Sequence, residues 1–233
     1  MKVLLFDLDG TLLPMDQDAF TNGYFSLIAK KLAPFGYEAN ALVKGIWAGT
    51  KAMVMNDGTR KNEDAFWEVF NQMYPETAER DRPLFDEFYE NEFDGAIQFC
   101  SPSKEVPAFI ASLKEKGYRM VLATNPIFPS VATMKRTKWA GLNPEDFEII
   151  TTYENTNFCK PNPAYYMDLA KRLGVSPEDC IMIGNDVEED LIAEKTGMKV
   201  FLLEDCMLNK KELDITKYPK GSFDACLKFI EEC

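Results

Sequence analysis

The chain has 233 residues, of which 46% are hydrophobic, and its formal net charge is -12 at pH 7. This composition supplies a core for one large domain or two smaller ones, and the acidic balance argues against nucleic acid or an anionic membrane as a partner, since both are polyanions. No apolar run reaches the roughly 18 residues that span a bilayer, and the N-terminal apolar run is too short for a signal peptide, so we expect a cytoplasmic protein.

The first predicted element is a short buried strand within the stretch KVLLFDLDGT at residues 2–11. Its apolar run stops at two carboxylates, Asp7 and Asp9, and Gly10 follows them. Taking an ionised carboxylate out of water costs several kcal/mol, so a buried strand that ends in two of them implies either compensation or use. A bound cation would supply the compensation.

Residues 15–96 carry apolar side chains at helical spacing, with no convincing strand between them. Asp16 or Asp18 is placed to cap the first helix, and Gly36 to end it. Further helical segments are predicted near residues 42–54, 66–73 and 84–89. This region therefore predicts a small all-helical unit.

From residue 101 onward, predicted helices and strands alternate at the lengths of βα units. The strands are expected at 120–123, 147–150, 180–183 and 199–203, and the helices at 106–113, 130–140, 164–173, 188–196 and 222–231. With the first strand they predict a doubly wound α/β fold, in which a parallel sheet is covered on both faces. Residues 1–14 and 97–233 would form this core, and residues 15–96 an insertion after the first strand.

In open sheets of this kind, ligands bind beyond the carboxyl ends of the strands. The polar residues expected there are Asp7, Asp9, Gly10, Thr124, Asn125, Asp186 and Asp190, and Lys160 precedes a proline between the last two groups. Each of these residues, taken singly, also has an ordinary interpretation as a turn, a surface lysine or a helix cap. Their occurrence together at the strand ends favours a functional site.

In this order, the motifs resemble those of the haloacid dehalogenase-like (HAD) hydrolase superfamily, which has a Rossmann-like core. DLDGT is similar to the first motif, Thr124 to the second, Lys160-Pro161 to the third, and the segment from Asp186 to Asp190 to the acidic fourth. The resemblance extends from residue 2 to about residue 205. One departure is that the fourth motif reads GND rather than the commoner GD, although the DxxxD spacing is kept.

The resemblance implies that Asp7 is a nucleophile that forms an aspartyl-phosphate, with Asp9 as general acid and base. A carboxylate attacks an anionic phosphate poorly unless the charge of that phosphate is neutralised. Mg²⁺, a hard cation that takes carboxylate and carbonyl oxygens, suits this task. Its implied ligands are the side chains of Asp7 and Asp186 and the backbone carbonyl of Asp9. The chain has no histidine, so general acid and base catalysis must come from carboxylates, Lys, Tyr, Cys or bound water.

By the same resemblance, Thr124 and the backbone of Asn125 bind phosphoryl oxygens, and Lys160 stabilises the charge on them in the transition state. Gly10 allows a sharp turn of the chain. Asp190 is expected to orient Lys160 or to support the metal ligands, unless it is only an acidic residue at the start of a helix.

The helical insertion resembles caps that close over small soluble substrates and exclude water. Candidate specificity residues in it are Gln17, Asp18, Tyr24, Trp47, Lys51 and Arg60. The two aromatic candidates also fit a helix core, and the two basic ones a solvated surface. The basic residues Lys135, Arg136 and Lys138 are interpreted as an exposed helix face.

The predicted function is a Mg²⁺-dependent phosphatase that acts on a small phosphorylated metabolite through an aspartyl-phosphate on Asp7. Dehalogenases of the superfamily lack the second Asp, so Asp9 favours a phosphomonoesterase or, as an alternative, a phosphomutase. An alternative of another class is a phosphorylation-dependent signalling module, since receiver domains also place acidic residues, a Thr and a Lys at strand ends. The sequence predicts neither the substrate nor the oligomeric state.

Overall fold

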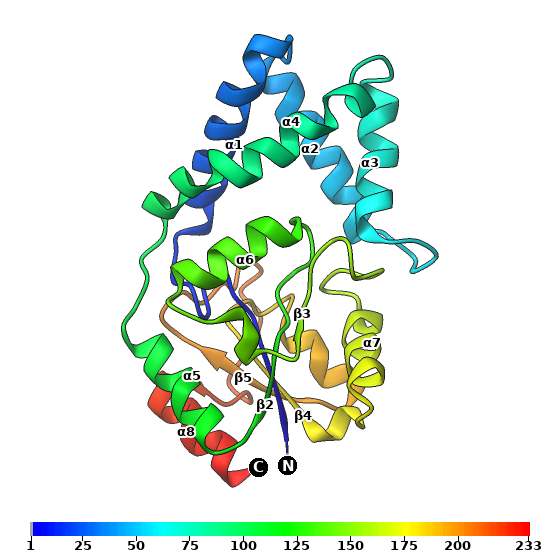
Figure 1. Cartoon of the computed structure of the whole chain (residues 1–233). Helices are drawn as coiled ribbons and strands as arrows, with labels where there is room; N and C mark the ends of the chain where they lie inside the picture. The colour runs from blue at the N-terminus through cyan, green and yellow to red at the C-terminus, as the bar shows by residue number, and fades with distance from the viewer. Residues whose placement is uncertain (1) are drawn as a thin grey trace.

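The computed structural model describes residues 2–233 and contains a six-stranded parallel sheet (Figure 1). The strands are β1 Val3–Phe6, β2 Arg119–Leu122, β3 Ile149–Ile150, β4 Cys180–Gly184, β5 Lys199–Leu203 and β6 Lys220–Gly221. Their spatial order is β3-β2-β1-β4-β5-β6, and each neighbouring pair is parallel. The order of connection therefore reverses between β1 and β4, which is where sheets of this type bind ligands.

Strand β1 is a continuous apolar run because both faces of the sheet are covered. Leu4 and Phe6 belong to one buried cluster, whereas Val3 and Leu5 belong to another, as expected from the alternation of side chains along a strand. All four residues are fully buried. The predicted doubly wound α/β core is thus confirmed.

Helices α5 Glu105–Glu115, α6 Ser130–Trp139 and α8 Phe223–Glu232 contribute buried residues to the cluster on the Phe6 face. Helix α7 Pro163–Leu173 and the short 3-10 helix η5 Leu191–Thr196 contribute to the cluster on the Leu5 face. The remaining 3-10 turns of this part are η3 Pro144–Asp146 and η4 Pro177–Asp179. The sheet is therefore a middle layer between two helical layers.

Four further helices form the helical unit: α1 Gln17–Leu32, α2 Ala39–Val54, α3 Asn62–Met73 and α4 Ala78–Asn91. The 3-10 helices η1 Ala33–Phe35 and η2 Phe93–Phe99 complete it. Figure 1 shows the unit at the end of the molecule away from the two termini, with α6 between it and the sheet. Asp16 caps α1 by accepting a hydrogen bond from the backbone N–H of Ala19 at 2.9 Å. Of the two predicted caps, Asp16 is therefore the one used.

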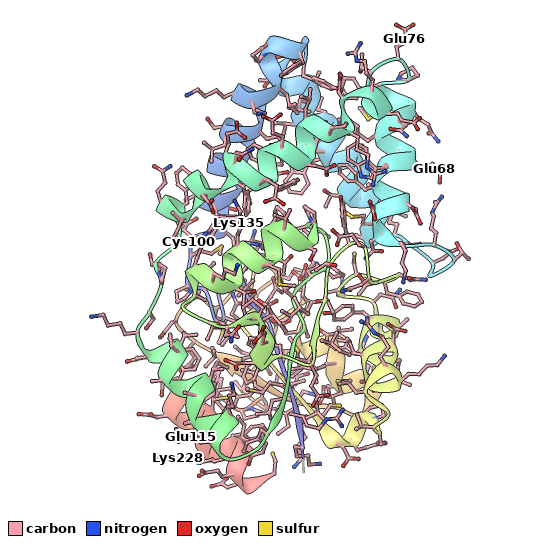
Figure 2. All side chains as sticks on the ribbon, viewed as in Figure 1. Glu68, Glu76, Cys100, Glu115, Lys135 and Lys228 are labelled. Atoms are coloured by element: carbon pink, nitrogen blue, oxygen red, sulfur yellow. The ribbon has the colours of Figure 1, made fainter. Side chains whose placement is uncertain are left out.

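The chain enters and leaves the helical unit at neighbouring points. Met15 and Cys100 form an isolated antiparallel bridge, and the backbone N–H of Ser101 donates to the carbonyl of Pro14 at 2.7 Å. Figure 2 shows Cys100 where the chain descends from the helical unit toward α5. The domain boundaries given above remain a prediction.

Two predicted elements differ from the structure. The helix expected at 188–196 is replaced by the shorter η5, because the carboxylate of Asp190 accepts hydrogen bonds from the backbone N–H groups of Asn185 and Asp186 and so bends the chain into a loop. Of the strand expected at 147–150, only the last two residues form a strand in the structure, namely β3. Strand β6 was not predicted. Within residues 2–233, no helix combines the length and apolar composition needed to cross a membrane.

Candidate active site

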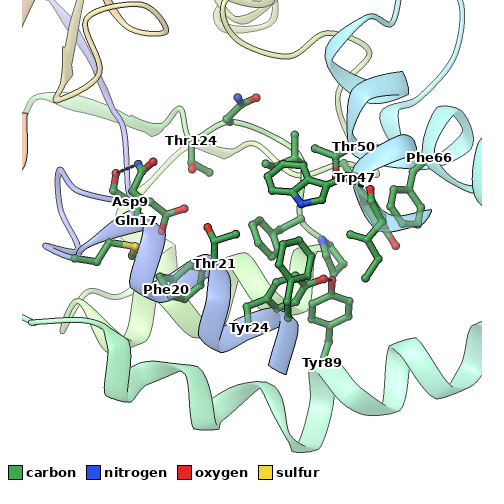
Figure 3. A pocket seen from close by; sticks show the side chains of 18 of the residues that line it. Asp9, Gln17, Phe20, Thr21, Tyr24, Trp47, Thr50, Phe66, Tyr89 and Thr124 are labelled. Atoms are coloured by element: carbon green, nitrogen blue, oxygen red, sulfur yellow. Dashed lines mark hydrogen bonds between the residues drawn. The ribbon is translucent and has the colours of Figure 1, made fainter. Parts of the chain in front are cut away.

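The carboxyl ends of the central strands open into a cavity that extends to the helical unit (Figure 3). Its empty volume is about 1230 Å³, including the open mouth. The residues at its sheet end are Asp7, Asp9, Thr124, Asn125, Asn185, Asp186 and Glu189. Figure 3 shows Asp9 and Thr124 at one end, and Trp47 and Phe66 at the other. The structure therefore brings most of the predicted site residues to one space.

Asp7 comes directly after β1 and is held there by a backbone hydrogen bond, which its N–H donates to the carbonyl of Ile183 at 2.9 Å. The next turn requires Gly10 for two reasons. Its φ is +85°, in the region that favours glycine, and a Cβ at this position would collide with the side chain of Asn185. The hydroxyl of Thr11 donates to Oδ1 of Asn185 at 2.9 Å, which ties this turn to the end of β4.

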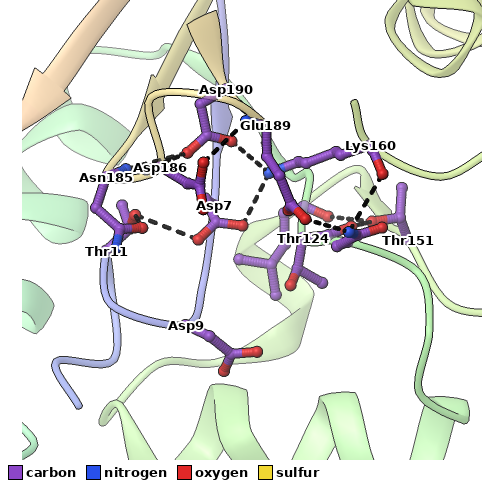
Figure 4. Close-up of polar contacts among 12 residues, drawn as sticks. Asp7, Asp9, Thr11, Thr124, Thr151, Lys160, Asn185, Asp186, Glu189 and Asp190 are labelled. Carbon is purple, nitrogen blue, oxygen red and sulfur yellow. Dashed lines mark hydrogen bonds and ion pairs between the residues drawn. The ribbon is translucent and has the colours of Figure 1, made fainter. Parts of the chain in front are cut away.

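Lys160 is fully buried and contacts two carboxylates (Figure 4). Its Nζ lies 2.8 Å from Oδ1 of Asp7 and 2.7 Å from Oδ1 of Asp190. Burial alone would lower the pKa of Lys160, but the charges of Asp190 and Asp7 outweigh it and hold that pKa well above its usual range. Burial raises the pKa of Asp7 above its ordinary range, against the opposing charge of Lys160. Lys160 therefore remains a cation beside Asp7.

Asp190 connects Lys160 to the loop after β4. Its Oδ2 accepts hydrogen bonds from the backbone N–H of Asn185 at 3.1 Å and of Asp186 at 3.0 Å. A side chain at Gly184 would collide with this carboxylate, so the glycine of the fourth motif allows the close approach. Asp190 therefore lies in position to orient Lys160.

Asp186 accepts hydrogen bonds at Oδ1 from the backbone N–H groups of Glu188 at 2.8 Å and Glu189 at 2.9 Å. Burial raises its pKa. Burial also raises the pKa of Glu189, to about 8, and the amide of Asn125 donates to this carboxyl group at 2.9 Å. Glu189 was not among the predicted site residues, although it lies within the acidic run of the fourth motif.

Thr124 is fixed through its backbone carbonyl, which accepts hydrogen bonds from the hydroxyls of Thr151 at 2.7 Å and Tyr165 at 3.0 Å. Its own side chain lines the cavity. No hydrogen bond of the Thr124 hydroxyl is found among residues 2–233, so this group is available to a ligand.

Asp9 is not directed toward Asp7. Its Oδ2 forms an ion pair with Nη1 of Arg136, and Figure 4 shows the Asp9 side chain pointing away from the pair of Asp7 and Lys160. The other oxygen, Oδ1, is buried without a hydrogen-bond partner among the described residues. The predicted acid-base group is thus at the cavity but held by a residue that was not predicted.

Arg136 corrects the interpretation of the basic residues on α6 as an exposed face. Its side chain is 0% exposed, and its guanidinium lies 4.3 Å from the centre of the Phe128 ring. Lys135 is half-buried and lies 2.8 Å from a carboxylate oxygen of Asp94, whereas Lys138 is exposed. The prediction was wrong for Arg136 because α6 packs beneath the helical unit, which a basic run in a sequence does not reveal.

The sheet end of the cavity contains donors that suit a divalent cation. Asp7 and Asp186 are carboxylates whose pKa is raised by burial, so they lack full compensation for a negative charge. The backbone carbonyl of Asp9 accepts only a long contact, 3.4 Å, from the amide of Gln17. No group of three or more His, Cys, Asp or Glu residues that would hold a metal occurs within residues 2–233, but the predicted set needs only two carboxylates and a carbonyl. Carboxylate and carbonyl oxygens fit Mg²⁺.

Of the six candidate specificity residues, three line the cavity: Gln17, Tyr24 and Trp47. Asp18, Lys51 and Arg60 do not line it, and Arg60 pairs instead with Glu68. Most of the aromatic lining was not predicted from the sequence, namely Phe20, Phe25, Phe66, Trp67, Phe85, Tyr89, Phe128 and Tyr153. The high density of aromatic residues in the helical unit was the available signal.

Known proteins that are similar to this chain agree with the family that its motifs resemble. Residues 1–195 match the model of haloacid dehalogenase-like hydrolases. The chain is 28% identical over 204 residues to the putative phosphatase YhcW of Bacillus subtilis, covering 87% of this chain and 83% of that protein. It is 26% identical over 204 residues to a phosphoglycolate phosphatase of Aquifex aeolicus, covering 87% and 84% of the two chains.

Two solved structures share the fold. A 2-haloacid dehalogenase from Pseudomonas syringae pv. tomato superimposes with a TM-score of 0.66 at 17% identity, over 100% of this chain and 99% of the other. A putative beta-phosphoglucomutase from Thermotoga maritima gives a TM-score of 0.58 at 18% identity, over 100% and 99%. At such identities the likeness concerns the fold alone.

Proposed function

The chain belongs to the haloacid dehalogenase-like hydrolase family, and from that premise we propose that it is a Mg²⁺-dependent phosphatase that acts on a small phosphorylated metabolite. The observation that carries the proposal is the buried contact of Lys160 with Asp7 and Asp190 at the end of β1, where Asp7 itself lines the cavity. The phosphatases among the relatives support it.

Asp7 is the nucleophile of the proposed reaction. One of its carboxylate oxygens attacks phosphorus, so that an O–P bond to Asp7 forms while the O–P bond to the substrate alcohol breaks. Lys160, 2.8 Å from Asp7, favours the ionised form of this carboxylate and stabilises the charge on the phosphoryl oxygens. Thr124 donates its hydroxyl to one of those oxygens, and the backbone of Asn125 binds another.

Mg²⁺, when bound, supplies positive charge against the phosphoryl oxygens. The side chains of Asp7 and Asp186 and the carbonyl of Asp9 would hold it. Asp190 keeps Lys160 in place by accepting a hydrogen bond from its ammonium group at 2.7 Å.

Asp9 moves the protons. It donates a proton to the leaving alcohol oxygen and later takes one from the water that hydrolyses the aspartyl-phosphate, which releases inorganic phosphate and restores Asp7. Because the Asp9 carboxylate is bound to Arg136 in this structure, the role requires it to turn from Arg136 toward the leaving oxygen.

A phosphomutase is the second candidate, since Asp9 serves that reaction equally and a putative mutase shares the fold. In a mutase the phosphoryl group on Asp7 is passed back to a sugar phosphate instead of to water.

The test is phosphate release from a panel of phosphate monoesters with and without Mg²⁺, with Asp7→Asn as the control. A phosphatase releases inorganic phosphate in amounts equal to the alcohol, whereas a mutase yields an isomeric sugar phosphate. Robust turnover by the Asp7→Asn protein would refute the mechanism.

A further inference from the structure

The end of the cavity remote from Asp7 is built from aromatic side chains of the helical unit. Tyr24 and Phe25 come from α1, Trp47 from α2, and Tyr89 from α4, and all four line the cavity. Phe128 closes it from the core side. Such walls bind apolar surface, and a flat ring most of all, because aromatic contacts add to the area that is buried.

The hydroxyls of Tyr24 and Tyr89 in this wall share one hydrogen bond. The hydroxyl oxygens of Tyr24 and Tyr89 lie 2.8 Å apart, and their rings stack with centroids 6.3 Å apart. Burial raises the pKa of Tyr24 to about 12, so its hydroxyl stays neutral. These two residues therefore offer a ligand mainly ring carbon, together with the one hydroxyl hydrogen that their mutual hydrogen bond leaves free.

Trp47 leaves an aromatic surface uncovered. Its exposed fraction is 51%, although its ring lies 5.5 Å from that of Phe25 and it lines the cavity. A ligand in the cavity would cover this surface.

No lysine or arginine lines the cavity among the described residues, and the chain has no histidine. Two buried cations, Lys160 and Arg136, lie at the phosphate end, where they contact Asp7 and Asp190, and Asp9, respectively. Neither lines the aromatic wall, so neither is placed to pair with a group beyond the phosphate. A carboxylate or second phosphate on the substrate would thus lose its hydration without gaining a cationic partner, which is costly.

We propose that the substrate is the phosphate monoester of an alcohol whose carbon part is aromatic and carries no second anionic group. The inference rests on the proposed phosphatase function and concerns only the part of the substrate beyond the phosphate. The substrate thereby differs from phosphoglycolate, the compound named for a relative, which carries a carboxylate.

The experiment compares kcat/KM for alkyl esters that differ in the group beyond the phosphate: 2-phenylethyl phosphate and 2-(indol-3-yl)ethyl phosphate against phosphoglycolate and O-phosphoserine. All four are esters of alkyl alcohols, which limits differences in leaving-group reactivity. We expect the two aromatic esters to be preferred by at least about ten-fold, the lower end of what an apolar pocket discriminates.

Two results would overturn the substrate class while leaving the phosphatase proposal intact. One is an equal or higher kcat/KM for phosphoglycolate or phosphoserine. The other is a preference for phosphocholine, whose cation would use Asp86 at the cavity wall. Failure of the phosphatase proposal looks different, because then none of the four esters, nor phosphocholine, nor p-nitrophenyl phosphate added as a reactive reference, would be turned over with Mg²⁺.

Variants locate the effect in the wall. Trp47→Ala should raise KM for 2-phenylethyl phosphate by about ten-fold with little change in kcat, since the ring contributes to binding the alcohol. Phe35→Ala is the matched control, an aromatic residue of the same unit that is 46% exposed and lies outside the cavity lining. Thr50→Lys, which adds a cation to the wall, should raise kcat/KM for phosphoserine. An unchanged KM in Trp47→Ala would count against the proposal.

Discussion

The guanidinium of Arg136 forms an ion pair with the carboxylate of Asp9, a residue 127 positions earlier in the chain. Asp9 is the proposed acid and base, so this contact holds a reacting group at the edge of the cavity. Arg136 is fully buried, whereas the Asp9 side chain is 21% exposed. The ion pair therefore joins helix α6 of the core to the turn after β1.

Replacing Arg136 by Met should destabilise the fold by about 3 kcal/mol, the lower end for breaking a buried pair, because one partner is partly solvated. Urea unfolding measures the change. The double variant that also carries Asp9→Asn should recover part of the loss, because no unpaired charge remains. Lys135→Met is the control, since its partner Asp94 is exposed and such pairs contribute at most about 1 kcal/mol. Equal losses in the two single variants would contradict the assignment.

Asp9→Asn should lower kcat by about 10²- to 10⁴-fold, because an amide can neither donate the proton to the leaving oxygen nor take one from water. KM should change little. Steady-state kinetics on a turned-over ester provides the measurement, and circular dichroism verifies the fold. A kcat within three-fold of the wild type would mean that another group moves the protons.

Lys160→Met should abolish turnover and also destabilise the protein by roughly 3–5 kcal/mol, because Asp7 and Asp190 are left buried without their cation. Denaturant unfolding of the purified variant measures the loss in free energy of unfolding. Lys217→Met is a suitable comparison, since both partners of its pair with Glu194 are exposed and the loss of stability should be small. The prediction fails if both lysines give the same small loss.

Removal of divalent metal with EDTA should abolish activity, and Mg²⁺ should restore it. A second readout is independent of turnover: Mg²⁺ at 100 times its dissociation constant should stabilise the folded protein by about 2.7 kcal/mol through linkage. Asp186→Asn should remove that response, whereas Asp168→Asn on α7, outside the cavity, should keep it. An Mg²⁺ response that survives in Asp186→Asn would place the ion elsewhere.

The start of α2 predicts a pH dependence of stability. The Glu38 carboxylate accepts hydrogen bonds from the backbone N–H groups of Asn40 at 3.0 Å and Ala41 at 2.8 Å, and these bonds lower its pKa. A lowered pKa contributes stability that is present above the unfolded value, about 4.3, and that is lost as the pH falls through the folded value.

Glu38→Gln should therefore have a lower Tm than the wild type at pH 7, with the difference shrinking in acid. Thermal unfolding followed from pH 7 to pH 3 measures it, and Glu76→Gln, at an exposed site, is the control. A Tm difference that grows on acidification would mean that the pKa of Glu38 is raised, not lowered, in the folded protein.

The strand ends could be predicted because parallel strands bring their carboxyl ends to one edge. Asp7 and Thr124 therefore share a cavity although they are distant in sequence. Arg136 could not be predicted in the same way, since its burial depends on how α6 lies against the helical unit. Glu189 was missed because an acidic run reads as a helix start, whereas here the Asp190 side chain bends that run into a loop beside the cavity.

The aromatic wall illustrates the same limit. Helical spacing indicated that Tyr24 and Trp47 could belong to a helix core, and Tyr24 is indeed buried, but Trp47 is half exposed beside the cavity. The distance between helices decides which aromatic residues face a neighbouring helix and which face a ligand. The pattern of a single helix does not contain that distance.

The bridge between Met15 and Cys100 makes the two connections of the helical unit a single junction. Because the two ends of the helical unit lie side by side, the core does not have to bridge a distance between them. Insertions are tolerated under this condition. Helices of another length or lining could therefore be exchanged at this junction while the turn after β1 stays unchanged. In such an architecture, a new insert would replace most of the aromatic wall, while the core keeps the phosphate end and Phe128.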